Sequence, residues 1–346
     1  MDKPNVPRKL PIGPTTWGLP TRLAIAHLER RGIDPAALLK RAGIWADALS
    51  LDTRISVMGQ IEFLNLAARA TADRWIGLTL AADFDLREMG LLYYVAASSD
   101  RLGEALHRLE RYVRVGNEAL VLRISKGTVC RVGLSYTGVP RHLDNHQIEF
   151  LGLAYLRLCR QLVGRNVMPV STCFVHHRSG DLGEARRYFG EVVGFDAQVD
   201  ELCLEAALLD APLVNADRFL SRLMLKNCEE ALAGRSKNVG PLRIVVENTI
   251  APLLPHGDVR AGTVARKLGL SERTLARRLK LEGVTFVEVL NDLRRELAIH
   301  YLEDQSLSIS HIAWLLGFHG PTGFSHAFQR WRGKSAAVYR RDHLSF

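Results

Sequence analysis

Four residues in the last third of the chain have the types and the spacing needed to read DNA. They fall at positions i, i+3, i+4 and i+7 of the segment TVARKLGLSERTLARRLKLEG, residues 263–283. At about 100° per residue these positions share one helix face, and Leu275 and Leu279 take the opposite, apolar face. Arginine pairs bidentately with guanine, and arginine or lysine also neutralises phosphate, so this face has the chemistry that a helix needs in the major groove. The four residues are Arg273, Ala276, Arg277 and Lys280.

The residues before this face predict the tight turn that would hold it. Val264 and Leu268 lie on one apolar helical stripe, which predicts a short preceding helix. Gly269 then suits the positive φ with which many helices end, and Ser271 is a good N-cap for the next helix. A short helix, a tight turn and a capped second helix make a helix-turn-helix, and we expect this unit over residues 261–282.

The same pattern occurs a second time, which predicts a second unit over residues 308–333. The apolar and glycine positions repeat at an offset of 48, so that Gly317 corresponds to Gly269. Phe324 and Phe328 replace the two inward leucines, and one extra residue in the turn moves the outward positions to an offset of 49. A single copy also fits a plain helical bundle with a basic surface, whereas two copies favour DNA reading. The outward positions of the second copy, with one neighbouring arginine, are Thr322, Ser325, His326, Gln329 and Arg330.

A long helix is expected between the two units. The segment TFVEVLNDLRRELAIHYL has an amphipathic pattern, and Thr285 with Glu288 fits a capping box at its start. About 18 residues at 1.5 Å each give a rod of roughly 27 Å. Successive major grooves on one face of DNA lie about 34 Å apart, so a rod of this scale can set two helices into adjacent grooves.

Residues 241–341 resemble the DNA-binding domain of AraC-type transcription regulators. The motifs that carry the resemblance are VARKLGLSERTLARRLKLEG, RRELAIHYL, LSISHIAWLLGF and PTGFSHAFQRWRGKSAAVYR, in the order and spacing of the family. The resemblance implies an all-α domain with two helix-turn-helix units joined by a long helix. Family members commonly have arginine where this chain has His326, whose imidazole reaches less far and is mostly neutral at pH 7. The resemblance maps the base readers onto Arg273, Ala276 and Arg277 in the first unit, and onto Thr322 and His326 in the second.

The first two thirds of the chain predict a separate α+β domain. Alternating runs at Leu120–Ser125 and Val129–Tyr136 indicate a β-hairpin, and Val170–His176 and Ala197–Leu204 also read as strands, with antiparallel pairing expected. The stretches MGLLYYVAASSDRLGEALHRLERYVRV and RHLDNHQIEF, together with Arg187–Gly190, resemble the arabinose-binding-like effector domain of one AraC subgroup. That label is a family name and does not make arabinose the ligand. The helices expected here include Pro35–Ala42, Ile55–Ala70, Leu102–Val115, Glu149–Leu162, Leu182–Phe189 and Val214–Ala233.

Composition and charge place the domain boundaries. The chain has 46 Lys+Arg against 37 Asp+Glu, and the part from Arg235 to Phe346 holds 17 basic and 10 acidic residues. Most of the excess positive charge therefore lies in the last third, which favours a polyanion partner for that part. Prolines concentrate in the first 20 residues, which indicates a mobile arm. We expect the arm over residues 1–20, an effector-sensing and dimerisation domain over 21–233, a linker over 234–241 and the DNA-binding domain over 242–346.

Several other chemistries lack the residues that they need. The five cysteines are an odd number without a C-x-x-C pair, which indicates reduced thiols in a cytoplasmic protein. His142 with His146, and His176 with His177, are too few converging ligands for a metal site, so neither a metal nor a cofactor is expected. The segment Gly133–Gly138 is one residue too long for a nucleophile elbow. With no apolar signal region and no run of roughly 18 apolar residues, neither secretion nor membrane insertion is expected.

Together these features predict a transcription regulator and not an enzyme. Its N-terminal domain would sense a small-molecule effector and form a homodimer, and its C-terminal domain would bind promoter DNA. The family resemblance further implies RNA polymerase as a partner and activation as the outcome. Two alternatives stay open: a constitutive DNA-binding dimer with a structural N-terminal domain, or an enzyme domain tethered to a DNA-binding domain.

Overall fold

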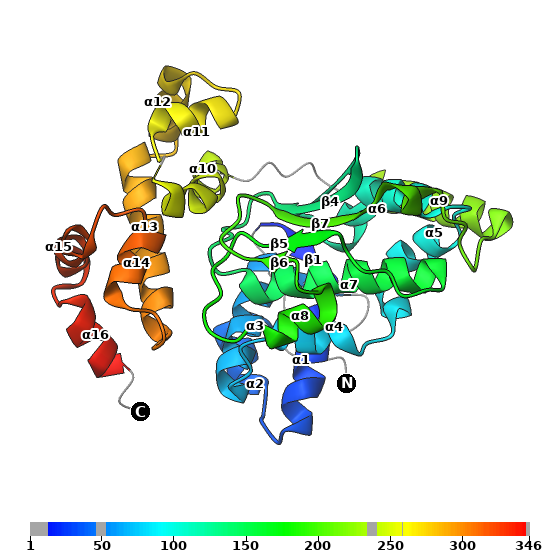
Figure 1. Cartoon of the computed structure of the whole chain (residues 1–346), viewed down its shortest axis with the longest axis horizontal. Coiled ribbons are helices and arrows are strands. Elements are labelled where there is room, and N and C mark those ends of the chain that lie inside the picture. Colours follow the sequence, from blue (N-terminus) through cyan, green and yellow to red (C-terminus); the bar gives the residue numbers. More distant parts are fainter. Residues whose placement is uncertain (1–12, 46–52, 234–240, 258, 344–346) are drawn as a thin grey trace, which may run out of the picture.

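The computed structural model describes residues 13–45, 53–233, 241–257 and 259–343. These residues form two domains, each with its own buried apolar cluster (Figure 1). The first cluster runs from Ala24 to Cys228, and the second from Val246 to Ala336. The predicted combination of an α+β N-terminal domain and an all-helical C-terminal domain is therefore confirmed.

A five-stranded sheet forms the β layer of the N-terminal domain, in the order β3-β4-β7-β5-β6. β3 and β4 form the predicted hairpin, in which Leu120 lies opposite Tyr136. The pairings are antiparallel, as expected, except that β5 and β6 run parallel over two residue pairs. The strands are β3 (Leu120–Lys126), β4 (Val129–Tyr136), β5 (Ser171–Cys173), β6 (Val193–Gly194) and β7 (Asp200–Glu205).

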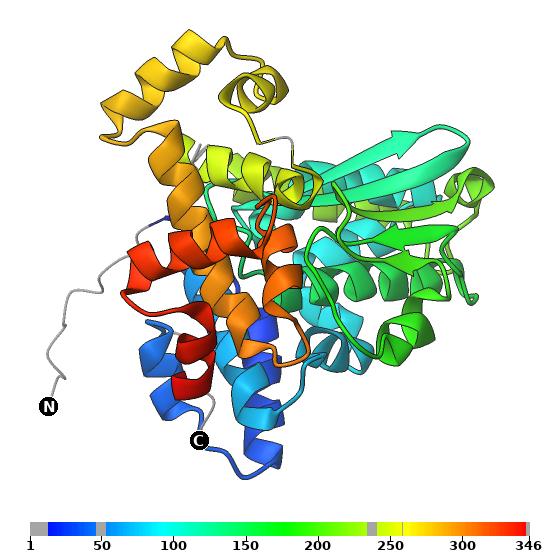
Figure 2. The ribbon, with the colours of Figure 1, turned by 60° about the vertical axis from the view of Figure 1, so that its left-hand side comes forward.

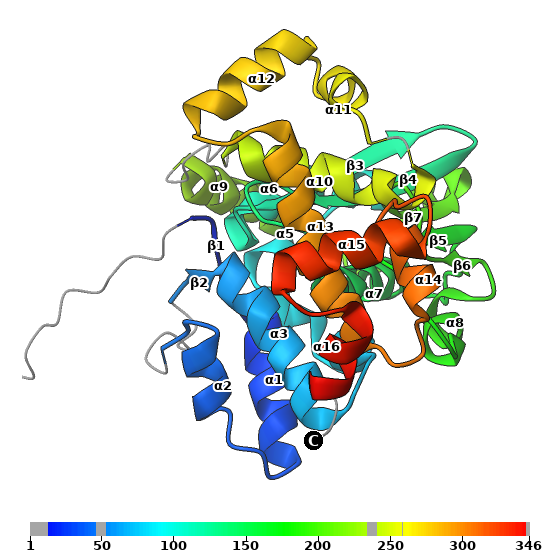
Figure 3. The ribbon, with the colours of Figure 1, turned by 90° about the vertical axis from the view of Figure 1, so that its left-hand side faces the viewer.

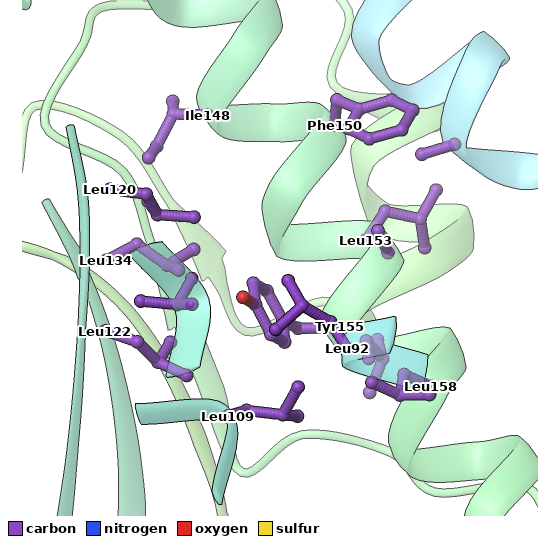
Figure 4. Packing of buried hydrophobic residues seen from close by; sticks show 14 of the residues in the cluster. Leu92, Leu109, Leu120, Leu122, Leu134, Ile148, Phe150, Leu153, Tyr155 and Leu158 are labelled. Carbon is purple, nitrogen blue, oxygen red and sulfur yellow. The ribbon is translucent and has the colours of Figure 1, made fainter. Parts of the chain in front are cut away.

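Helices pack on this sheet and build the rest of the domain. Figure 4 shows Leu120, Leu122 and Leu134 of the β-hairpin facing Tyr155 of the long central helix α7. Because side chains alternate along a strand, every second residue of β4 and of the first half of β3 reaches this core. The helices are α1 (Leu19–Arg30), α2 (Ala36–Arg41), α3 (Val57–Thr71), α4 (Ile76–Ala82), η2 (Leu86–Met89), α5 (Leu91–Ala97), α6 (Leu102–Gly116), α7 (Asn145–Val163), α8 (Gly183–Phe189), η3 (Ala206–Asp210) and α9 (Arg218–Ala233).

The prediction of an arm over residues 1–20 is wrong at its C-terminal end. β1 (Thr15–Thr16) pairs antiparallel with β2 (Ile55–Ser56), and α1 begins at Leu19. A carboxylate oxygen of Glu118 accepts from the first backbone N–H of β1 at 2.8 Å, and Arg54 donates to the carbonyl of the same residue at 2.7 Å. These partners lie far away in the sequence, so local composition does not reveal them. Residues 1–12 of the arm and 234–240 of the linker lie outside the described residues.

The short helices α4 and α5 were not expected from the sequence pattern. Five of the seven residues of each helix are buried, so there is no polar face to mark a helical period. Packing against α7 holds α4 in place: a Cβ atom added at Gly77 would come within 2.1 Å of the His146 carbonyl oxygen. Glycine is required there because the two helices approach so closely, and this is tertiary information.

In the described part of the C-terminal domain there are eight helical segments, with the long helix α13 at the centre (Figures 1 and 3). Leu275 and Leu279 of the first predicted unit, and Phe324 and Phe328 of the second, are all buried in its core with Leu293 of α13. The segments are α10 (Leu242–Ile250), η4 (Ala251–His256), α11 (Ala261–Lys267), α12 (Glu272–Leu281), α13 (Phe286–Glu303), α14 (Ile309–Leu315), α15 (Pro321–Arg332) and α16 (Ala336–His343).

Candidate nucleic-acid interface

The first helix-turn-helix consists of α11 and α12. Gly269 takes a φ of +66° in the turn, and the backbone N–H of Leu270 donates to the Ala265 carbonyl at 2.9 Å. Ser271 caps α12, because its Oγ accepts from the Thr274 N–H at 3.2 Å. Capping and turn therefore form as the sequence pattern predicts. The four residues proposed to read DNA are exposed on α12, namely Arg273, Ala276, Arg277 and Lys280.

The second helix-turn-helix consists of α14 and α15 and repeats this geometry. The Phe318 N–H donates to the Ala313 carbonyl at 2.9 Å, which is the counterpart of the contact in the first unit at an offset of 48 residues. Gly317 has a φ of +69°, and a Cβ atom there would come within 2.6 Å of the Leu254 carbonyl oxygen. The turn glycine is thus needed for its backbone conformation and for its close contact with η4. On α15 the exposed predicted residues are Thr322, His326, Gln329 and Arg330, and Ser325 is half-buried.

The two units start their second helices differently. α12 has the Ser271 side-chain cap, whereas α15 follows Gly320 and has Pro321 in its first turn, with no side-chain cap. This is where the extra residue of the second copy lies. Base contacts by either face stay a prediction, because the structure holds the protein alone.

A single arginine that the sequence analysis did not single out fixes the second unit to α13. Arg294 donates from Nε to the Leu316 carbonyl at 2.9 Å and from Nη2 to the Gly317 carbonyl at 3.0 Å. Its guanidinium also lies 4.7 Å from the ring centroid of Phe318. A cation thus satisfies the two carbonyls that follow the C-terminal end of α14, where the helix dipole favours positive charge. The only signal in the sequence is that Arg294 belongs to the RRELAIHYL motif.

The N-terminal domain packs against α10 and α13, and we call this contact the domain interface (Figure 2). Asn248 of α10 donates to the Val139 carbonyl at 2.7 Å and accepts from the Arg141 N–H at 3.0 Å. His142 lies 2.7 Å from a carboxylate oxygen of Glu296 on α13. In Figures 1 and 3, α15 lies on the side of α13 away from the N-terminal domain. The predicted reading residues therefore remain exposed while the domains are packed together.

Of the histidines and cysteines considered in the sequence analysis, His142, His176 and His177 each contact a carboxylate, and the Cys159 thiol is buried in the core. His176 Nε2 lies 2.9 Å from Glu149, which also accepts from Arg178 at 2.6 Å. Burial alone would raise the pKa of Glu149, but Arg178 and His176 hold it at about 2. Burial raises the pKa of the Cys159 thiol to about 12, so this thiol is a core residue and a poor nucleophile. Among the described residues, no helix has the length and apolar character needed to cross a bilayer.

Comparison with known proteins gives the same division of the chain. Residues 32–213 match the family model "Arabinose-binding domain of AraC transcription regulator, N-term", and residues 264–342 match the model "Helix-turn-helix domain". Over 344 residues the chain is 28% identical to the ornithine utilization regulator of Pseudomonas aeruginosa, covering 96% of this chain and 99% of the relative.

Two further known proteins match most of the chain. The HTH-type transcriptional regulator VirS of Mycobacterium tuberculosis is 28% identical over 319 residues, covering 90% of this chain and 92% of the relative. The crystal structure of the transcriptional regulator CdpR from Pseudomonas aeruginosa is 24% identical, covers 93% of this chain and 98% of its own, and gives a TM-score of 0.47. The N-terminal family model alone matches more than half of the chain. The chain therefore belongs to the AraC family of DNA-binding transcription regulators, in the group with an arabinose-binding-type N-terminal domain.

Proposed function

We propose that this regulator activates transcription in the cytoplasm, as a homodimer, in response to a small-molecule effector. The observation that carries the DNA-binding part is the pair of exposed polar helix faces, on α12 and α15, held by one rigid helix. α13 has 18 residues, so at 1.5 Å per residue it spans roughly 27 Å. Activation of transcription and contact with RNA polymerase are inferred from membership of the AraC family.

Each reading face has a distinct chemical role in this proposal. Arg273 and Arg277 of α12 pair with guanine edges, Ala276 contacts a thymine methyl group and Lys280 neutralises phosphate. The second face has fewer charges. Its hydroxyl, imidazole and amide groups form shorter-range contacts, which come from Thr322, Ser325, His326 and Gln329, with Arg330 at the phosphate backbone.

An effector acts by changing the balance between two arrangements of the domains. A ligand that binds one arrangement more tightly shifts the population toward it by its differential affinity. The relative named for ornithine utilization makes ornithine one member of the first effector library. The domain interface is the contact through which such a shift would reach α13.

Selection of DNA sites from a random pool tests the proposal directly. We expect the full chain to enrich a site with two half-sites about one helical turn apart, and Arg277→Ala to relax one base position of the first half-site. Enrichment of no sequence would overturn sequence-specific reading. A library member that changes operator affinity would support effector control over the constitutive-dimer alternative. Turnover of a library member by the N-terminal domain would favour the tethered-enzyme alternative.

A further inference from the structure

A cavity of about 220 Å³ lies between the two domains. We call it the interdomain cavity. Its N-terminal-domain wall includes Arg141, His142, Asp144 and Asp200, and its opposite wall includes Asn248 of α10 and Tyr301 of α13. It therefore exists only while the domains are packed together, and its contents contact both.

The buried polar wall of the interdomain cavity carries more negative than positive charge. Arg141 donates from Nε to Asp144 at 2.8 Å and from Nη2 to Asp200 at 2.7 Å. The Asp144 and Asp200 side chains are only 2% and 0% exposed. The second oxygen of Asp200 accepts from the Val175 N–H at 2.9 Å. Of the four carboxylate oxygens, Oδ1 of Asp144 is thus the one that receives no hydrogen bond among the described contacts. One guanidinium faces two carboxylates, so the formal charge of this wall is −1.

Two imidazoles of the same wall have hydrogen-bonding capacity to spare. His142 is 2% exposed and His176 is 14% exposed, and both line the interdomain cavity. Among the described residues, Nδ1 of each ring is buried without a hydrogen-bond partner. Buried polar atoms in native proteins normally have partners, so these two ring nitrogens are available to a hydrogen-bonding group in the cavity.

We propose that the interdomain cavity binds a small molecule with a protonated amine, whose ammonium group lies against the Asp144 carboxylate. The volume of about 220 Å³ suits a small molecule with a short carbon chain. Leu134, Val175 and Leu297 supply apolar walls for a short carbon chain. This inference rests on the proposed function, since it gives the effector a place and a chemical class.

Burial makes the charged state of Asp144 sensitive to such a ligand. Burial raises the pKa of this carboxyl, and the neighbouring Arg141 opposes that shift. A cation in the interdomain cavity favours the ionised carboxylate, which in turn holds the ammonium group. An anion placed there would face an uncompensated negative charge in a site with little water, which is costly.

The position of the interdomain cavity couples its occupancy to DNA reading. Leu297 and Tyr301 belong to α13, the helix that fixes the two reading units. Asn248, on the same side, makes hydrogen bonds to the backbone beside Arg141. A ligand bound between these groups stabilises the packed arrangement of the domains, because separation would expose it.

A larger hollow on the N-terminal domain is the strongest competitor. It is lined by Arg157, Arg160 and Arg165, which would suit an anion. Arg157 and Arg160, however, donate to backbone carbonyls of α4, α8 and neighbouring loops at 2.6 to 3.1 Å, which are structural contacts. This hollow also lies away from α13, since its lining comes from the N-terminal domain alone.

Calorimetric titration of the full chain tests the proposal with three probes of similar size: 1-aminobutane, 1-butanol and butyrate. We expect binding of 1-aminobutane and at least tenfold weaker binding of both 1-butanol and butyrate. Asp144→Asn keeps the shape of the side chain but removes its charge, and should weaken 1-aminobutane at least about tenfold. Val199→Phe narrows the interdomain cavity from a position that is 52% exposed, and should weaken all probes. Arg165→Ala, in the competing hollow, is the matched control and should change nothing.

Hydrogen exchange provides a second measurement that does not depend on the variants. With 1-aminobutane bound, we expect slower exchange in residues 141–144 and 297–301. Equal affinity for 1-aminobutane and butyrate, or unchanged binding in both Asp144→Asn and Val199→Phe, would overturn the proposal. Operator affinity, measured separately, distinguishes failure of the proposed cavity site from failure of the proposed effector control. A library effector that changes operator affinity without occupying the interdomain cavity refutes the site alone, whereas an amine that binds there without changing operator affinity refutes effector control.

Discussion

Replacing Arg294 by alanine should release the second reading unit from α13 while leaving the first in place. Arg294 makes two hydrogen bonds to the carbonyls of Leu316 and Gly317, just after α14, and a cation–π contact with Phe318. The corresponding turn of the first unit has no such arginine among its described contacts. The change therefore removes a support that only the second unit has.

The contacts set the size of the expected effect. A hydrogen bond to a charged group contributes about 1.5–3 kcal/mol, and a partly exposed cation–π pair contributes about 0.5–1 kcal/mol. Arg294 is half-buried, so water can replace part of what the two carbonyls lose. We therefore expect Arg294→Ala to destabilise the C-terminal domain by about 2–4 kcal/mol, most of it around Gly317.

The neighbouring arginine of α13 supplies a matched control. Arg295 forms an ion pair with Asp292 at 2.9 Å, and its side chain is 38% exposed. A pair of this kind contributes less than about 1 kcal/mol, so Arg295→Ala should have little effect. Hydrogen exchange of α14 and α15, measured at equal protein concentration, compares the two variants. Binding to operators with one half-site scrambled shows which unit is lost.

Equal effects of Arg294→Ala and Arg295→Ala would refute this reasoning, because they would show that two helix-capping contacts do no more than one surface ion pair. Loss of both half-sites together would also contradict it. That outcome would mean that the C-terminal domain unfolds as one cooperative unit, and that α15 has no separate support.

Three further predictions concern the reading faces and the domain interface. Arg277→Ala should cost about 1–3 kcal/mol of specific binding at one base position, measured by competition; a loss that is uniform over all sequences would make it a phosphate contact. His326→Arg should strengthen binding to operator and scrambled DNA alike by adding a fixed cation, and a selective loss on the operator would show a tuned base contact instead. His300, near Arg178 and His142, has its pKa lowered to about 4 by burial, against 6.5 when free. The state with separated domains thus binds more protons, so domain packing should weaken as the pH falls from about 6.5 to 4. Hydrogen-exchange rates in α13, corrected for their intrinsic pH dependence, measure this weakening. Slower hydrogen exchange in α13 on acidification would contradict the prediction.

The two helix-turn-helix units are predictable from sequence because their signals are local. Ser271 caps the helix that follows it, and Gly269 and Gly317 mark turns within a few residues. The exposure of Arg277 follows equally from helical periodicity once Leu275 is known to be inward. In such segments, local propensity and tertiary packing agree.

The domain interface and the interdomain cavity could not be predicted in the same way. Glu296 looks like the solvated side of an amphipathic helix, because its partner His142 lies over a hundred residues away in the chain. His142 likewise looks like a surface histidine until Glu296 is placed beside it. Polar contacts between domains leave no period in the sequence, since they involve single residues on each side.

The small size of the interdomain cavity limits how strongly the two domain arrangements can differ in free energy. A shift from 1:99 to 99:1 requires about 5.5 kcal/mol of differential affinity. Very small ligands reach at most about 1.5 kcal/mol per non-hydrogen atom, so an amine of about six atoms supplies at best roughly 9 kcal/mol. A ligand approaches this upper limit of binding free energy only if every atom fits the cavity. The packed and separated arrangements must therefore lie within a few kcal/mol of each other in free energy. The domain interface fits this requirement, because the contacts that define it are polar pairs such as His142 with Glu296, in place of a continuous apolar core.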